Sequence, residues 1–215
     1  MVPVTIFESF VIELRMFGKH LQLILLNISS IEDKIQQESE EIRSRIYPEY
    51  HDEGDVRWKA EKKVMGEFAD FDIFRQKSGA IAGYCVIIFH LFERFIEEVN
   101  LFLDCNGKIK QFVQFKDKYA DVSGLPGCSL IDELRLLCNV CKHGTGPAYE
   151  ELKKTRPDYF DRTGLRFSPI KLLAGYDLNI EEEDFLKYSK AITDFTESLA
   201  SKVSYPKLDT GTEEA

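Results

Sequence analysis

The residues best suited to chemistry lie in the segment 130–143. Arg135, Asn139 and His143 follow one another at intervals of four residues. At ~100° per residue on an α-helix, they fall within about 80° of one another, with Asp132 among them. An imidazole can transfer a proton near neutral pH, and a guanidinium can hold a phosphate. The segment therefore suits metal-independent cleavage of a phosphodiester by the RNA 2′-hydroxyl. His143 would transfer the proton, Arg135 would bind phosphate and Asn139 would position the scissile group.

The same segment also has a purely structural interpretation. A basic residue, a histidine and a glycine, here Lys142-His143-Gly144, are typical of a helix C-terminus whatever the protein does. Lys142 is a candidate phosphate contact or a solvated lysine near the helix end. The opposite side of the helix is apolar and needs the core; it carries Leu130, Leu134, Leu137, Cys138 and Cys141.

A second polar strip lies on a long predicted helix upstream. His90, Glu93, Arg94 and Glu97 share it. These residues could form a second wall of a site, with Glu93 orienting it and His90 and Arg94 contacting substrate. They could equally form ion pairs along the helix surface.

Composition limits the function classes. The chain has 215 residues, 44% hydrophobic and 30% charged, enough for one domain with a sizeable core. Its net charge of −9 argues against non-specific binding of duplex DNA, because phosphate contacts need a basic surface. A small local RNA site remains compatible with that charge.

The cysteines indicate a reducing, cytoplasmic location. Five cysteines are present, an odd number, and Cys85 lies inside an apolar helical pattern. Cys138, Cys141 and His143 share one helical run with no second ligand pair at zinc spacing, so we expect no metal site. No cofactor motif is found.

The chain also lacks a convincing membrane segment. The most apolar stretch, Gly79 to Phe92, is shorter than the ~20 residues that a transmembrane helix needs. Charged residues follow it directly, so we expect a buried core helix. The first ten residues have no basic start, which argues against a signal peptide.

Hydrophobic periodicity predicts an all-α fold. A helix from about residue 5 either breaks near 27–30 or continues to about 46. Further helices are predicted at about 56–74, 78–104, 109–119, 130–143, 147–154 and 179–203. We expect Ser129 to cap the helix at 130 and Asn179 to begin the last helix. Residues 161–178 read as irregular, with room for a short strand pair, and 206–215 as a disordered tail.

Three apolar stripes are expected to face the core. The first helix contributes Phe7, Phe10, Val11, Leu14, Phe17, Leu21 and Ile24. The long central helix contributes Ile81, Tyr84, Cys85, Ile88, Leu91, Phe92, Phe95, Val99 and Phe102. The last helix contributes Ile180, Phe185, Tyr188, Ile192, Phe195 and Leu199.

The segment 138–146 resembles the signature helix of HEPN-fold proteins, many of which carry Arg-Asn-x-x-x-His near the end of a late helix. Asn139 and His143 stand at matching positions. The stretch Ser78 to Asp104, with Glu93 after an apolar run, resembles the central helix of that fold. The resemblance implies a HEPN-like up-and-down bundle at 78–205, preceded by an N-terminal helical extension at 1–77. It also implies a homodimer in which two signature helices form one composite site.

Members of that family are often metal-independent ribonucleases of toxin–antitoxin or phage-defence systems. The resemblance therefore implies RNA as a substrate and an antitoxin or another defence protein as a partner. Other members are inactive and serve as dimerisation or binding modules. This chain departs from the pattern at Cys138, where the family has its arginine; Arg135 is the nearest arginine. Two hypotheses stay open: an RNA-cleaving or RNA-binding protein, and a catalytically inactive helical module. A small-molecule sensor has no supporting motif.

Overall fold

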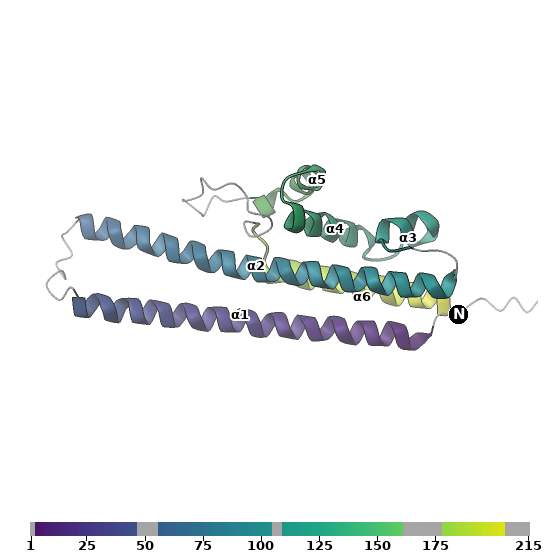
Figure 1. The fold of residues 1–215 in the computed structure, drawn as a ribbon, viewed down its shortest axis with the longest axis horizontal. Coiled ribbons are helices and arrows are strands. Elements are labelled where there is room, and N and C mark those ends of the chain that lie inside the picture. The colour runs from purple at the N-terminus through teal and green to yellow at the C-terminus, as the bar shows by residue number, and fades with distance from the viewer. Residues whose placement is uncertain (1–2, 47–55, 105–108, 161–177, 205–215) are drawn as a thin grey trace, which may run out of the picture. The chain divides into compact units, whose positions relative to one another are not determined.

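The computed structural model describes residues 3–46, 56–104, 109–160 and 178–204, and over these ranges the regular structure is entirely helical (Figure 1). The predicted all-α fold class is confirmed. The expected strand pair at 161–178 and the expected tail lie almost wholly outside the described residues. The helices are α1 Val4–Ile46, α2 Val56–Leu103, α3 Phe112–Lys118, α4 Cys128–His143, α5 Pro147–Thr155 and α6 Glu182–Ser204, with short 3₁₀ turns at Ala120–Val122 and Pro157–Phe160.

The second helix is longer than the sequence pattern suggests, and the first matches one of its two predicted forms. Of the two alternatives for α1, the continuous helix is correct. The prediction of a new helix near Ser78 is wrong, because α2 runs through this position without a break. Ser78 is buried, and its hydroxyl donates to the carbonyl of Ile180 at 3.4 Å. A tertiary partner thus satisfies the hydroxyl that could have capped a helix, and the predicted boundary at residue 77 falls inside α2.

Three other helix starts differ from prediction, and α3 begins at Phe112 rather than at about 109. Helix α4 begins at Cys128, so Ser129 lies in its first turn rather than capping it. Helix α6 begins at Glu182 rather than at Asn179. The backbone N–H of Asn179 donates instead to the carbonyl of Tyr159 at 2.8 Å. In each case the local signal for a helix start lies within three residues of the observed one.

The chain forms two compact units, and α1, α2 and α4 each contribute to both. The first unit comprises residues 1–18, 84–138 and 182–215, and the second comprises 19–83 and 139–181. Each unit is described separately below.

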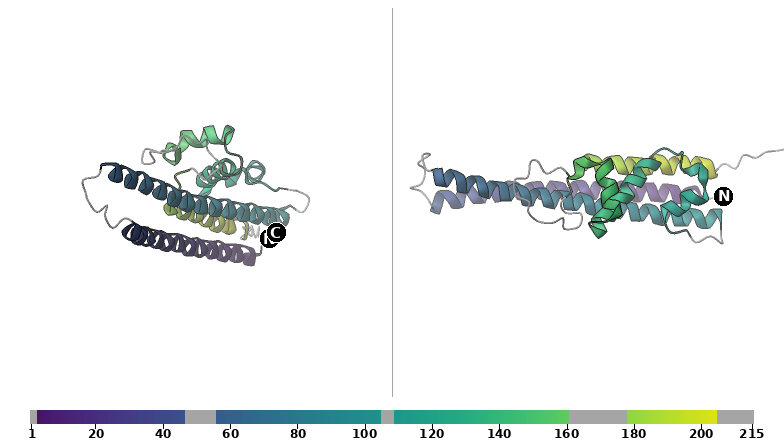
Figure 2. Two further views of the ribbon diagram at one scale, coloured as in Figure 1. Left: turned by 60° about the vertical axis from the view of Figure 1, so that its left-hand side comes forward. Right: turned by 90° about the horizontal axis from the view of Figure 1, so that it is seen from above.

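Aromatic rings fill the core of the first unit. Phe92 of α2 lies edge-on to Phe112 of α3 at 5.1 Å and to Phe195 of α6 at 5.5 Å between ring centroids. Phe10 of α1 stacks on Phe95 at 4.5 Å. In this unit α1, α2 and α6 therefore lie side by side (Figure 2).

The predicted core stripes are largely confirmed. Every residue named for the last helix is buried, and so are most of those named for α1 and α2. Phe102 is an error, since 48% of it is exposed. In the last turn of α2 the buried position belongs to Asn100, whose side-chain oxygen accepts from Tyr119 at 3.2 Å and Lys118 at 3.3 Å. These polar contacts turn Phe102 towards solvent.

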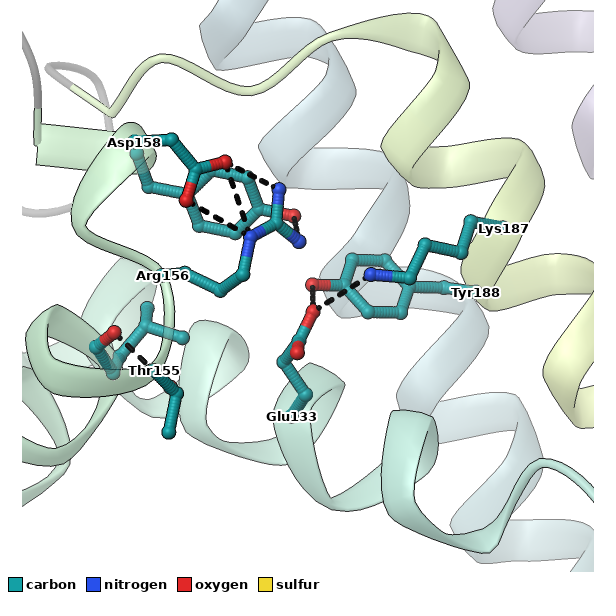
Figure 3. Close-up of polar contacts among 8 residues, drawn as sticks. Glu133, Thr155, Arg156, Asp158, Lys187 and Tyr188 are labelled. Carbon is teal, nitrogen blue, oxygen red and sulfur yellow. Dashed lines mark hydrogen bonds and ion pairs between the residues drawn. The ribbon is translucent and has the colours of Figure 1, made fainter.

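The second unit has its own buried residues around α5. Leu152, Tyr159 and Leu178 are buried, and Tyr149 packs edge-on against Phe160 at 4.9 Å. Cζ of Arg156 lies 3.7 Å from the ring centroid of Tyr159. The guanidinium also donates to both carboxylate oxygens of Asp158 (Figure 3). The end of α5 is thereby fixed by a cation–π contact and a two-pronged ion pair.

Within the described ranges, one helical stretch, Arg75–Leu103, meets the length and hydropathy needed to cross a membrane, and 44% of its apolar window is buried. This is weak evidence for a membrane span, because core helices pass the same test. Its charged residues Glu93, Arg94, Glu97 and Glu98 lie towards its C-terminal end.

We predict that Phe92→Ala lowers the free energy of unfolding by about 3–5 kcal/mol, because it removes a ring packed on three helices. Urea unfolding followed by circular dichroism measures this. Phe102→Ala is the matched control on the same helix and should change stability by less than about 1 kcal/mol. Equal losses in the two variants would contradict the central role of Phe92.

Candidate functional site

Helix α4 carries the central residues of the predicted site, and glycines mark both of its ends. Gly127, just before it, has φ of 81°, and a Cβ there would lie 2.1 Å from the carbonyl oxygen of Ala191 in α6. Gly144, just after it, has φ of 70°, and its N–H donates to the carbonyl of Val140 at 2.8 Å. Glycine fits both places because other residues are strained at positive φ. His143 is therefore the last helical residue.

The polar strip of α4 is narrow. Of the residues predicted to face the core, Leu134, Leu137 and Cys138 are buried, and Leu130 and Cys141 are partly buried. Ile131, Leu136 and Val140 are buried as well. Apolar side chains thus border the polar strip on both sides. Asp132, Arg135 and Asn139 are partly buried, whereas Lys142 and His143 are exposed in the last turn.

In the first unit, the charge of Arg135 is shared with neighbours of the same chain. Its Nε lies 3.8 Å from Oδ1 of Asp132. The other carboxylate oxygen accepts from Lys116 of α3 at 2.5 Å. Nε of Arg135 and Oδ1 of Asp132 are buried, and neither has a hydrogen-bond partner among the described residues. One carboxylate thus lies between two cations, and Arg135 belongs to a structural ion-pair group as well as to the predicted site.

Lys116 was absent from the sequence-based site. It approaches Asp132 across the loop between α3 and α4, and its ammonium also lies 5.1 Å from the ring centroid of Phe112. Helical periodicity reports faces within one helix, so no sequence signal marked this partner.

In the second unit, Asn139, Lys142 and His143 occupy the end of α4. The structure describes no hydrogen bond or ion pair from the His143 imidazole within the described ranges. An exposed histidine there is accessible to substrate, and it also places a basic group near the carbonyl end of the helix dipole.

Cys138, at the family's arginine position, is a core residue. It is fully buried, and its thiol contacts the carbonyl oxygen of Cys85 in α2 at 3.6 Å. The interpretation of Cys138 as a small core residue is confirmed. An arginine at this position would enter the apolar core rather than the polar strip, because the strip lies on another side of α4.

The polar residues on α2 of the first unit make ion pairs. Arg94 donates to Glu13 of α1 at 2.9 Å and lies 3.9 Å from Glu98. His90 lies 3.6 Å from Glu93, an ion pair when the imidazole is protonated. Two carboxylates therefore pair with the guanidinium of Arg94, which was predicted to contact substrate. Glu13, like Lys116, was not found from the sequence.

Another polar contact of the first unit joins α4 to α6. The buried Tyr188 donates its hydroxyl to Glu133 at 2.7 Å, and Lys187 donates to the same carboxylate oxygen at 3.2 Å (Figure 3). These bonds give Glu133 a structural role, fixing how α4 packs on α6 within this unit.

The four cysteines within the described ranges have little nucleophilic character. Cys85, Cys128, Cys138 and Cys141 are thiols rather than disulfides. Burial raises the pKa of Cys141 to about 12, against the opposing effect of Lys142. Burial also raises the pKa of Cys128, which Lys116 lowers and Asp132 raises further. Both thiols therefore stay protonated at neutral pH.

In the part of the chain that the structure describes, no three His, Cys, Asp or Glu residues are grouped to hold a metal ion.

Comparisons with protein-family models, curated proteins and solved structures found no match to this chain.

We predict that Cys138→Arg, which introduces the arginine that the resemblance to HEPN proteins would have here, lowers the free energy of unfolding by about 3–5 kcal/mol or prevents folding, because it buries an unpaired charge. Thermal and urea unfolding measure the loss. Cys138→Ala is the control for loss of the thiol and should cost about 1 kcal/mol. A Cys138→Arg protein as stable as the original would show that this position opens to solvent.

Proposed function

We propose that this chain is a catalytically inactive helical module that binds a partner protein along α1. The observation that carries this proposal is a strip of exposed large aliphatic side chains. Ile12, Met16, Leu23 and Leu26 are 58%, 53%, 59% and 67% exposed. Helix α1 is continuous, so these positions share a face by helical geometry alone.

The spacing of the strip matches the surface of another helix. With Lys19 included, its members follow at alternating intervals of four and three residues, the repeat of a coiled-coil seam. A second seam on α1, which includes Phe7, Phe10, Leu14 and Leu21, is already buried. Folding requires one apolar face of α1, so the other is available for binding.

Area sets the expected strength. Burial of the exposed half of these four side chains contributes about 4–6 kcal/mol to the free energy of binding, before the costs of association are subtracted. This is enough for weak binding, and a partner must add polar contacts for a tighter complex.

Charge favours a particular kind of partner. Arg15 and Lys19 are exposed on or beside the strip, in a chain whose net charge is −9. A second copy pairing through this strip in register would set Lys19 against Lys19, which disfavours self-association. The partner we propose is therefore a different protein that offers an amphipathic helix with an acidic residue opposite Lys19.

A designed peptide tests this proposal. A three-heptad helical peptide with leucine at the seam positions and glutamate at the central one should bind the full chain about 2–5 times more tightly than the same peptide with lysine there. Fluorescence anisotropy measures both affinities. Lys19→Glu should reverse the order.

The contact itself has a matched control. The double variant Leu23→Ser, Leu26→Ser should abolish peptide binding, whereas Leu186→Ser, an exposed leucine of α6, should leave it unchanged. If neither the charge exchange nor the double variant changes the affinity for the peptide, docking on α1 is refuted.

A second candidate function is metal-independent RNA cleavage, favoured by the exposure of His143 one turn after Asn139. This candidate includes a homodimer that brings two α4 helices together. Arg135 and Lys142 would hold the RNA substrate, and the protein would act in bacterial defence. A cytoplasmic location fits both candidates, since the described cysteines are thiols.

If the protein cleaves RNA, replacing His143 should remove that activity. Full-length protein incubated with total RNA in EDTA should cleave it, and His143→Ala should reduce the rate by about 100-fold or more if the imidazole transfers the proton. His20→Ala, which removes another exposed histidine, is the control and should cleave normally. Equal inertness of all three proteins would eliminate this candidate.

A further inference from the structure

A pocket of about 320 Å³ opens between α1 and α2 within the first unit. Phe10 and Phe95 line it, both almost fully buried and stacked 4.5 Å apart. Ile6 and Leu91 add aliphatic surface. The volume lies at the lower end of the range for ligand pockets, roughly 300–1,000 Å³, and suits a small molecule or one long side chain.

Three charged side chains line the same pocket. Arg94 makes its ion pair with Glu13 at 2.9 Å and lies 3.9 Å from Glu98. Two carboxylates thus share one guanidinium, which leaves one negative charge in excess. All three side chains are about half exposed, so an incoming group can reach them.

This charge balance selects the sign of a ligand. An anion would compete with two carboxylates for Arg94, whereas a cation would meet the carboxylate that the guanidinium only partly neutralises. The hydroxyls of Thr5 and Ser9, also in the lining, can accept hydrogen bonds from an ammonium group, which has three donors.

We propose that this pocket binds a primary alkylammonium group: a short apolar stem against Phe10 and Phe95, with its charged end beside Glu98 and Glu13. The same chemistry is offered by a free diamine and by a lysine side chain of another protein. The pocket is separate from the exposed strip of α1, since neither Ile12 nor Met16 lines it. The inference stands apart from the proposed function.

Calorimetry on the full chain tests the sign of the ligand. We expect saturable binding of 1,4-diaminobutane and none of butyrate at the same ionic strength. Capped lysine forms a second arm: tighter binding than the diamine points to a protein side chain, and weaker binding points to a free amine. Absence of saturable binding by both amines would overturn the proposal.

Variants locate the binding. Glu98→Gln should weaken diamine binding about 2–5-fold, as expected for loss of one surface charge contact. Glu97→Gln removes the same charge one residue away, outside the lining, and should leave binding unchanged. Equal weakening by both would mean that general electrostatics attract the amine, and would overturn the site.

A double variant tests the charge balance directly. Glu13→Gln with Glu98→Gln leaves Arg94 as the charged group of the lining, so binding should switch from the diamine to butyrate. Backbone amide shifts in NMR spectra should then centre on Ser9 and Leu91 for either ligand. Continued preference for the diamine would refute the role of these carboxylates.

Discussion

Packing of phenylalanine rings around Phe92 is the interaction on which the first unit depends. The rings come from α1, α2, α3 and α6. Phe92 of α2 is fully buried and contacts a ring from each of the other three helices. Each aromatic pair adds about 0.5–1.5 kcal/mol to the gain from burial alone. Because close-packed cores tolerate little change in volume, these rings also fix which residues of each helix face outwards.

The position of α4 follows from this core. Gly127 allows the start of α4 to approach the backbone of α6, and Cys138 allows its other side to approach α2. A small residue is needed at each contact. Cys138 then stands where the resemblance to HEPN proteins would have an arginine, so packing and the family's chemistry place opposite demands on one position. This conflict weighs against the family's arginine chemistry on α4.

Charge follows the same logic. A charged group close to the core must be paired, because loss of hydration is costly. Arg135 lies beside Asp132, and Asp132 accepts from Lys116. At the surface, Arg94 lies between two carboxylates. The chemistry that remains available to partners lies on outer surfaces: the aliphatic strip of α1 and the acidic pocket beside it.

The sequence by itself determined the all-α class, most helix positions and the large buried side chains of α6, because helical periodicity is a local property that needs no knowledge of neighbours. The 3–4 spacing of the exposed strip on α1 was also present in the sequence, although the first helix was interpreted through its other face. Tertiary structure decided the rest. Ser78 continues a helix because Ile180 accepts its hydrogen bond, and Phe102 is exposed because Asn100 is held by Lys118 and Tyr119. Glu13, which pairs with Arg94, and Lys116, which pairs with Asp132, come from other helices, and Glu13 lies 81 residues from Arg94 in the chain. Periodicity gives the face of a residue, but the charge opposite that face is set by how helices pack.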